Sequence, residues 1–531
     1  MPVPRSISSV RRGLAAIVGV ALVATLAGSA LAAPGGQGKA GFKTAVPSML
    51  IPGADAPAGV VIDPIISVGD TLNNGFVFDS IPDGISFTMS GQGRADLYVN
   101  HETSLVPFPG ILTDFTNSHV DRLVMNQQSG GILSGSDAIP SDANYQRFCS
   151  NFLAGPAEGF DREILFTNEE ATDIVNRVGL SWPAIPAVGS NPEQAGVVVA
   201  LDIKSGEFRT IYGMGRHNHE NSVAIPGYDE LVVLSGDDTF TAPSSQLYSY
   251  IASDTDAIWN DEGDLWAFVG EDGFNDYGDL TDGDDITGHF IEVPRNVAIG
   301  DQNALESWSN ANNVFQFIRI EDIAYDRNDS NVVYFADTGE PRALPDPATG
   351  RLMRGPSGTM GPYPNGRIFR MVLNEDDPTL VDSLTILINP DPLGPGVADA
   401  LHNPDNLETT GNSLLIQEDT GSHNQFDLGT GPGARVWKYD LATGALDAVL
   451  EVDQSLDEDP AYDVGGFVAR AGGWESSGIV DASSIWGPGW FLVDVQAGSL
   501  ILESEPGFLG PNPVVFEREG GQLLRVHIPG A

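Results

Sequence analysis

The amino-acid sequence predicts an all-β protein folded as a β-propeller of about six blades with inserted loops. Short runs of Val, Ile, Leu, Tyr and Phe alternate with clusters of Gly, Pro, Asn and Asp, as in strands joined by turns. Six of these runs end in an acid or an amide, and aromatic second strands follow several of them. The six runs are residues 97–102, 164–169, 231–238, 332–337, 414–419 and 490–494. Such repetition is typical of propeller blades, and an all-β protein of several sandwich domains is the alternative.

The spacing of four acids supports the propeller. Glu220, Glu321, Asp405 and Glu475 each open a short segment ahead of one of these runs, at separations of 321 − 220 = 101, 405 − 321 = 84 and 475 − 405 = 70 residues. We expect each acid to begin the innermost strand of a blade, so that all four point toward one axis. Carboxylates gathered in this way repel one another, and the arrangement therefore predicts bound cations. A single modest helix is expected over residues 168–178.

The N-terminal residues have the pattern of an export signal. Arg11 and Arg12 precede an apolar run over residues 13–31, and the small residues around Ala32 suit signal peptidase. We expect a signal peptide over 1–32, of the twin-arginine type, then an extended lead-in over 33–60 and a single propeller domain over 61–531. An ordinary secretory signal, which can also contain paired arginines, and an uncleaved membrane anchor are the alternatives. The mature protein is expected in the periplasm, at the cell surface or outside the cell, with no membrane-spanning segment.

The composition narrows the range of partners. The chain carries 73 Asp and Glu against 26 Lys and Arg, a formal net charge of −47, and phosphate polyanions such as nucleic acid are therefore excluded as partners. Hydrophobic residues make up 41% of the chain, which argues against disorder. The acidity indicates either solubility in a salty medium or sites for hard cations. Cys149 is the one cysteine, and no internal disulfide can form.

Histidines and arginines lie beside several of the acids. The segments 100–102 and 216–220 combine oxygen ligands with imidazole, and the second also contains Arg216. Oxygen ligands suit calcium or magnesium, and mixed imidazole and carboxylate suit a transition metal. Arg319 stands two residues before Glu321, as expected where a phosphate-like anion is held bidentately. We expect Arg319, Glu321 and Arg216 to be catalytic. The histidines next to acids or amides are His101, His217, His219, His402 and His423.

These segments together resemble the PhoX type of secreted, twin-arginine-exported alkaline phosphatases and the wider propeller family that contains them. The matching pieces occur in the family's order over most of the mature chain. They are residues 98–102, Cys149 with 168–170, 215–220, 235–238 with 246–250, 319–322 and 403–407. The C-terminal segment 473–481 resembles calcium-propeller esterases and phytase-like proteins as well.

The resemblance implies a metal-dependent phosphomonoesterase that uses calcium ions together with ferric iron. In that family a cysteine thiolate binds iron, and Cys149 resembles that cysteine; Arg319 resembles the residue that contacts phosphate. The sequence leaves open which of Glu169 and Glu170 is a ligand. The full set of expected metal ligands is Cys149, Glu169, Glu170, Glu220, Glu321, Asp405, Asn100, Glu102, Asp237 and Asp238.

The expected partner is a small phosphorylated substrate, and the protein is expected to be a monomer. Two alternative functions remain open at the level of sequence. One is a calcium-dependent propeller hydrolase of another class, acting on lactones, phosphotriesters or phytate. The other is a secreted calcium-binding propeller without catalytic activity.

Overall fold

Strands dominate the computed structural model, which describes residues 40–102, 118–177, 192–239, 244–348, 350–419, 431–457, 473–509 and 512–531. These residues belong to one unit, Ala40–Ala531. The expected signal peptide over 1–32 and His423 lie outside the described residues.

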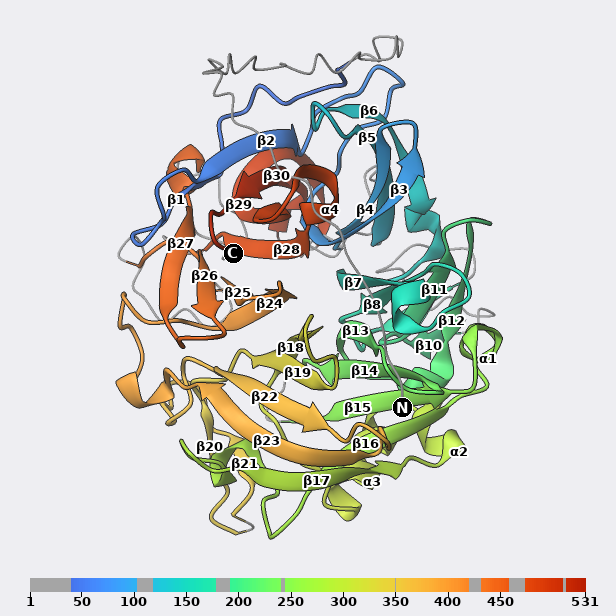
Figure 1. Cartoon of the computed structure of the whole chain (residues 1–531), viewed down its shortest axis with the longest axis vertical. Helices are drawn as coiled ribbons and strands as arrows, with labels where there is room; N and C mark the ends of the chain where they lie inside the picture. The colour runs from blue at the N-terminus through green and yellow to red at the C-terminus, as the bar shows by residue number, and fades with distance from the viewer. Residues whose placement is uncertain are drawn as a thin grey trace, which may run out of the picture. The chain divides into compact units, whose positions relative to one another are not determined.

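Six antiparallel groups of four strands, counted over the described residues, repeat one plan (Figure 1). In each group the strand that follows the preceding blade in the sequence lies innermost. The later strands of the group lie successively further out. The first three groups are β3 (Pro82–Gly91), β4 (Arg94–His101), β5 (His119–Asn126) and β6 (Ile132–Ile139); β7 (Phe148–Ala154), β8 (Ile164–Glu169), β11 (Val198–Asp202) and β12 (Glu207–Ile211); and β13 (His219–Ile225), β14 (Leu231–Asp237), β15 (Leu247–Ala252) and β16 (Asp264–Gly270).

The other three groups follow the same plan, and the last of them takes its outer strand from the beginning of the chain. They are β18 (Ile320–Tyr325), β19 (Val332–Asp337), β22 (Arg367–Leu373) and β23 (Leu380–Ile388); β24 (Pro404–Thr409), β25 (Ser413–Glu418), β26 (Arg435–Asp440) and β27 (Leu446–Val452); and β28 (Glu475–Asp481), β29 (Trp490–Leu509), β30 (Asn512–His527) and β2 (Val61–Ser67).

The six inner strands form a closed ring, which confirms the propeller. β3 contacts β7, β7 contacts β13, and the series continues through β18, β24 and β28 until β28 returns to β3 (Figure 1). Strand pairing, and not a covalent link, closes the ring. β2 pairs with β30 in register Val61↔His527 and so joins the two ends of the unit. β1 (Leu50–Pro52), in the expected lead-in, pairs with β27.

The remaining elements decorate the blades. β17 (Ile286–Glu292) pairs with both β16 and β23 and so merges two blades into one nine-stranded sheet. Two small hairpins, four short α-helices and six single-turn 3-10 helices complete the described part of the chain. The hairpins and α-helices are β9 (Ile174–Asn176) with β10 (Pro192–Gln194), β20 (Ala343–Pro345) with β21 (Leu352–Arg354), α1 (Thr255–Trp259), α2 (Arg295–Ala298), α3 (Gln302–Ala311) and α4 (Ser483–Trp486). None of the helices in the described ranges is long and apolar enough to cross a membrane.

The structure contradicts the helix expected over residues 168–178. It describes this range up to residue 177, and none of that part is helical. Asn168 and Glu169 are the end of β8, a central strand that pairs with β7 on one side and β11 on the other. Ile174–Asn176 form β9. Pairing on both edges fixes the extended backbone here, and it outweighs the weak local preference for a helix.

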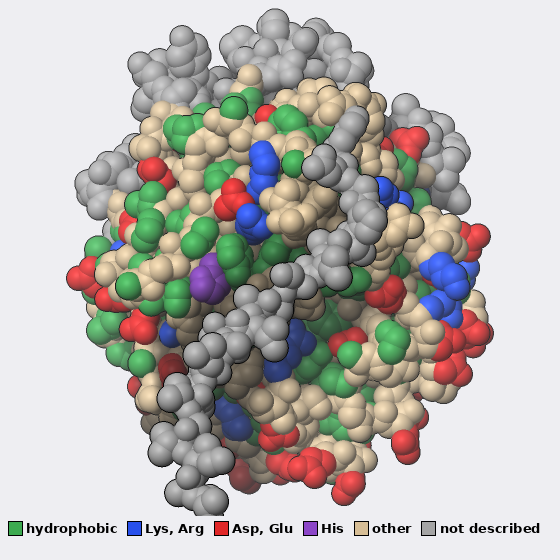
Figure 2. Space-filling view, turned by 45° about the horizontal axis from the view of Figure 1, so that its top comes forward, with side chains coloured by type: hydrophobic (Ala, Val, Ile, Leu, Met, Phe, Trp, Pro, Cys, Tyr) green, Lys and Arg blue, Asp and Glu red, His purple; other side chains and the backbone are tan. Residues whose placement is uncertain are grey.

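The hydrophobic core lies between neighbouring blades. Between β13–β17 and β18–β23, the rings of Phe268, Phe315, Phe317, Phe335 and Phe369 pack together, each at 0% exposure. Aromatic and β-branched residues on both faces of the central strands supply this packing. Many acids instead lie on the surface, where they gather along the lower and right edges of the face in Figure 2. Much of the net negative charge is therefore solvated.

Candidate metal centre

A β-bulge recurs near the start of the inner strands and aims one side chain from each blade toward the axis. In the first five inner strands the register with the next strand shifts just after the first residue: Pro82/Ile85, Phe148/Asn151, His219/Ser222, Ile320/Ile323 and Pro404/Leu407. Bulges re-aim side chains and are frequent next to active sites. The residue that follows the first is in every case of a metal-binding type, and the sixth inner strand begins with one. These residues are Asp83, Cys149, Glu220, Glu321, Asp405 and Glu475.

These six residues, with three more, form what we name the axial cluster. Within the described residues it consists of four triads in which the ligand atoms lie within 4.8 Å of one another. Consecutive triads share Cys149, Glu220 and Asp405, so the cluster is continuous. Its members are Asp83, Glu102, Cys149, Glu170, Glu220, Glu321, Asp405, Asp419 and Glu475.

The axial cluster is electrostatically unfavourable unless positive charge is added. Burial, reinforced by the neighbouring carboxylates, raises the pKa of Glu170, Glu220 and Glu321 well above the ordinary value. The same causes raise the pKa of Asp83 to about 7. Over the described ranges, Oε2 of Glu220 and Oδ1 of Asp405 are buried and have no hydrogen-bond partner. Buried oxygens without partners are costly, and a bound cation would satisfy them.

Cys149 gives one end of the cluster a different donor set. Its Sγ lies 2.8 Å from Oδ2 of Asp83, to which the thiol donates, and 3.9 Å from Oε1 of Glu102. Burial and then the charge of Asp83 raise the pKa of the thiol well above its ordinary value. A cation here would have the opposite effect, because thiolate is the ligand form. Sulfur with carboxylates suits iron, whereas the two triads without Cys149 contain only the oxygen ligands that calcium prefers. The residues present therefore fit both ions.

Arg319 is held at the edge of the axial cluster. Its Nε donates to Oδ1 of Asp238, and its Nη2 lies 2.5 Å from Oδ2 of the same carboxylate. Nη2 is also 3.3 Å from Oε1 of Glu321. The guanidinium is thus oriented by a buried bidentate pair and directed toward an acid of the cluster.

A second layer of polar residues joins neighbouring blades beneath the cluster. It includes the next residue of three of the bulges, Asn221, Asp322 and Asn406. Asn221 donates to Asp322, and Oδ2 of Asp322 accepts from the backbone N–H of Leu407 at 2.7 Å. Oδ1 of Asn406 accepts from the N–H of Gly478 at 3.1 Å. These bonds cross from blade to blade and hold the inner strands in register, which keeps the ligand side chains in position.

Three of the expected ligands do not join the axial cluster, because other groups already bind them. Glu169 forms a bidentate pair with Arg177, with Nη2–Oε2 at 2.7 Å, so that Glu170 is the member of the cluster. Asn100 donates to the carbonyl oxygen of Cys149 at 2.6 Å and so supports that residue's backbone. Asp237 accepts from Thr239 at 2.7 Å.

Two further expected site residues lie outside the triads. Asp238 is bound to Arg319 and acts on the cluster through it. Arg216 is expected to be catalytic, but its guanidinium donates to the carbonyl oxygen of Gln194 and lies over the ring of Tyr212 at 5.5 Å. The structure therefore does not bring Arg216 to the cluster.

Asp83, Asp419 and Glu475 are members of the cluster that were not among the expected ligands, although Glu475 was one of the four predicted axial acids. Asp83 could have been found from spacing alone. It precedes Cys149 by 149 − 83 = 66 residues, and Cys149 precedes Glu220 by 220 − 149 = 71, close to the separation of 70 between Asp405 and Glu475. One ligand-type residue for each blade is the underlying pattern.

Comparison with known proteins supports the fold. PhoX of Pseudomonas fluorescens, solved in complex with vanadate as a transition state analogue, matches with a TM-score of 0.60 at 18% sequence identity, over 92% of this chain and 98% of that chain. The GH93 α-L-arabinofuranosidase of Fusarium graminearum, solved with arabinobiose, matches with a TM-score of 0.37 at 9% identity, over 87% and 97%. No protein-family model matches the chain, and no curated protein matches it. The chain therefore has a propeller fold like that of PhoX.

Proposed function

We propose that this protein is an exported, metal-dependent phosphatase that hydrolyses phosphate monoesters. The observation that carries the proposal is the convergence of one ligand-type residue from each of the six inner strands, with Arg319 fixed beside them. The PhoX structure with vanadate supports the same choice, since vanadate is described there as a transition state analogue.

The axial cluster would hold calcium ions and a ferric ion. Cys149, with Asp83, Glu102 and Glu170, offers the sulfur-containing end for iron. The carboxylates that continue from Glu220 to Glu475 offer the oxygen-only end for calcium. When bound, such cations neutralise the charge of a phosphate ester and polarise its oxygens.

The chain's own residues would bind and orient the substrate. Arg319 presents a planar set of N–H donors, and the bond to Asp238 limits its rotation, so a phosphate oxygen would meet a guanidinium already in place. Glu321 contacts this arginine and also belongs to the triad with Glu220 and Asp405. It therefore connects Arg319 to the rest of the axial cluster. The phosphate would therefore lie between Arg319 and the ligands of the cluster.

The test is hydrolysis of p-nitrophenyl phosphate by the purified mature protein in calcium, before and after chelation. We expect turnover that chelator abolishes and calcium restores. Glu321→Gln should lower both kcat/KM and the calcium content. Glu408→Gln is the matched control, because Glu408 is a buried acid on an inner strand that pairs with Arg327 at 2.8 Å, outside the axial cluster. Absence of turnover on any phosphate monoester by protein shown to contain its metals would overturn the proposal.

A further inference from the structure

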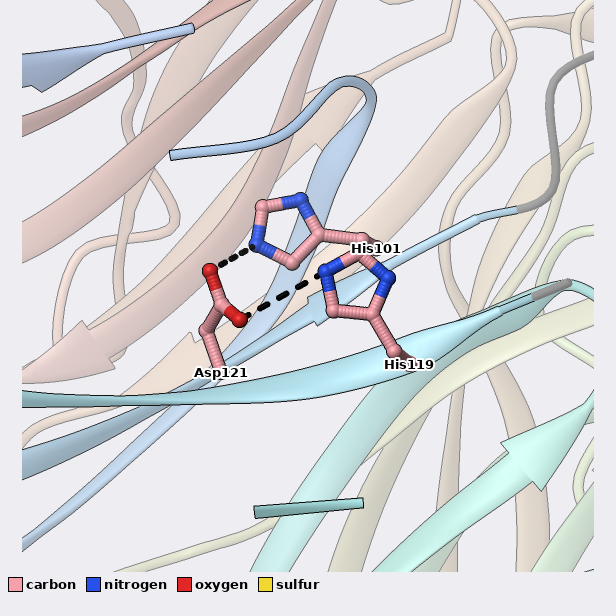
Figure 3. Close-up of side chains that lie close together, drawn as sticks. All are labelled: His101, His119 and Asp121. Carbon is pink, nitrogen blue, oxygen red and sulfur yellow. Dashed lines mark ion pairs between the residues drawn. The ribbon is translucent and has the colours of Figure 1, made fainter. Parts of the chain in front are cut away.

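A second group of metal-binding side chains lies in the first blade, apart from the axial cluster. His101 is on β4, and His119 and Asp121 are on the neighbouring strand β5 (Figure 3). His101 and His119 are directly opposite each other in the register, and Asp121 is two residues further along β5, so all three side chains share one face of the sheet. Their exposures are 0%, 4% and 0%.

This face is not the one that serves the axial cluster. Glu102, the next residue after His101, accepts from Gln496 at 3.0 Å and approaches Cys149. His101 packs instead against Phe78, with ring centroids 5.0 Å apart, and against the backbone of Ser80. Side chains that alternate along the strand thus enter two different environments.

The separations between the donor atoms match those of ligands on one metal ion. Nε2 of His101 lies 3.1 Å from Oδ2 of Asp121, and Nε2 of His119 lies 3.5 Å from Oδ1. Ligands about 2.0–2.2 Å from a tetrahedral ion are separated by about 3.3 Å. The two imidazoles are nearly parallel, at 8° with centroids 4.6 Å apart, and both direct Nε2 toward the carboxylate (Figure 3).

In the part of the chain that the structure describes, hydrogen bonding leaves several buried atoms between these side chains without a partner. Nδ1 of His101 is 3.0 Å from the carbonyl oxygen of Ser80, which can only accept, so Nδ1 carries a proton. In the neutral ring, Nε2 then presents its lone pair to Asp121. Across the described ranges, neither this Nε2 nor either oxygen of Asp121 makes a hydrogen bond of acceptable geometry. A metal-binding histidine that donates its other N–H to a backbone carbonyl is the usual arrangement.

We infer that His101, His119 and Asp121 bind a divalent transition-metal ion of the zinc type at a site separate from the axial cluster. Two imidazoles and one carboxylate suit such an ion better than calcium, which prefers oxygen ligands. The ion links β4 to β5 next to Glu102 and has a structural role. The inference does not depend on the proposed phosphatase activity.

Zinc content measures the site directly. The mature protein is stripped with chelator, reloaded with calcium and zinc, desalted and analysed for zinc per chain. We expect His119→Gln and Asp121→Asn each to bind one zinc fewer than the wild type. His289→Gln is the control, since His289 is half-exposed and faces the single acid Glu271 at 3.6 Å; it should retain the wild-type content. Equal zinc content in all four proteins would overturn the inference, because any zinc in the axial cluster is common to all of them.

A measurement on the unaltered protein removes the dependence on folding of the variants. Crystals of the wild type grown with zinc should show an anomalous peak at the zinc absorption edge within about 2.2 Å of Nε2 of His101, Nε2 of His119 and an oxygen of Asp121. Zinc-containing crystals without that peak would show that a proton, and not a metal, lies between these side chains.

Discussion

Replacing Asp238 with asparagine removes the negative charge that holds Arg319 beside the axial cluster. The side chains of Asp238 and Arg319 are 0% and 10% exposed, and two hydrogen bonds connect them. Removing one partner of a buried ion pair costs about 3–5 kcal/mol, because the other charge stays buried. Asparagine keeps one acceptor oxygen, and Glu321 remains 3.3 Å from the guanidinium. We therefore expect Asp238→Asn to lower the free energy of unfolding by about 3 kcal/mol, the lower end of that range.

The assay is urea unfolding at a fixed calcium concentration, with Asp96→Asn as the matched control. Asp96 also pairs with an arginine, at 2.5 Å, but the side chain of Arg122 is 45% exposed and water can solvate it once the pair is lost. The control should cost less than about 1 kcal/mol. Hydrolysis of p-nitrophenyl phosphate should fall at least about tenfold in kcat/KM for Asp238→Asn, because the guanidinium is no longer oriented, and should be unchanged for Asp96→Asn.

Equal losses of stability in the two variants would refute the reasoning, since it rests on the difference in burial between the two arginines. Wild-type stability of Asp238→Asn would refute it equally. Loss of stability without loss of activity would keep the ion pair as a structural feature and remove Arg319 from the proposed substrate site.

Three further outcomes are expected. Cys149→Ser should remove iron and the visible absorption of a ferric thiolate while calcium content is kept, as elemental analysis and spectroscopy would show; a colourless, iron-free wild type would contradict this. Burial raises the pKa of Asp391 to about 6 despite Arg367, so its contribution to stability is complete below about pH 4 and lost as the pH rises through 6. Wild type should lose about 3 kcal/mol relative to Asp391→Asn between pH 4 and 7 in urea titrations, and a constant difference would be contrary evidence. Gly478 has φ of +45°, and an added Cβ would lie 2.4 Å from the carbonyl oxygen of Asp83; Gly478→Ala should therefore cost about 2 kcal/mol by calorimetry, and an unchanged melting temperature would argue against this close packing.

The sequence was sufficient for the all-β propeller because the blades repeat one order of runs and turns. Glu220, Glu321 and Asp405 were predicted to open inner strands, and each is the second residue of one. Asp83 was not recognised, because it lies between Pro82 and Gly84, two residues with low strand propensity. In the first five inner strands, the ligand-type residue lies in a β-bulge. A bulge is a shift in register between two paired strands, and the periodicity of a single segment does not reveal it.

The choice between Glu169 and Glu170 shows a different limit. Both are buried acids in succession, so hydrophobic pattern and spacing treat them alike. In the structure the two acids have different partners. Arg177 pairs with Glu169, whereas Glu170 joins Cys149 and Glu220 in the axial cluster. A tertiary ion pair of this kind depends on where the chain returns after the strand has ended, and local sequence does not determine that return.

The closure of the ring links the proposed chemistry to the stability of the fold. The inner strands meet around an axis where each contributes an acid or a thiol, and the pairing of β2 with β30 joins the two ends of the unit. With a single cysteine, no disulfide within the chain can strengthen that closure. Under the proposed function, each cation held by residues such as Glu220, Glu321 and Asp405 would join three blades at once. The charge needed to bind a phosphate would then be the charge that keeps the blades together.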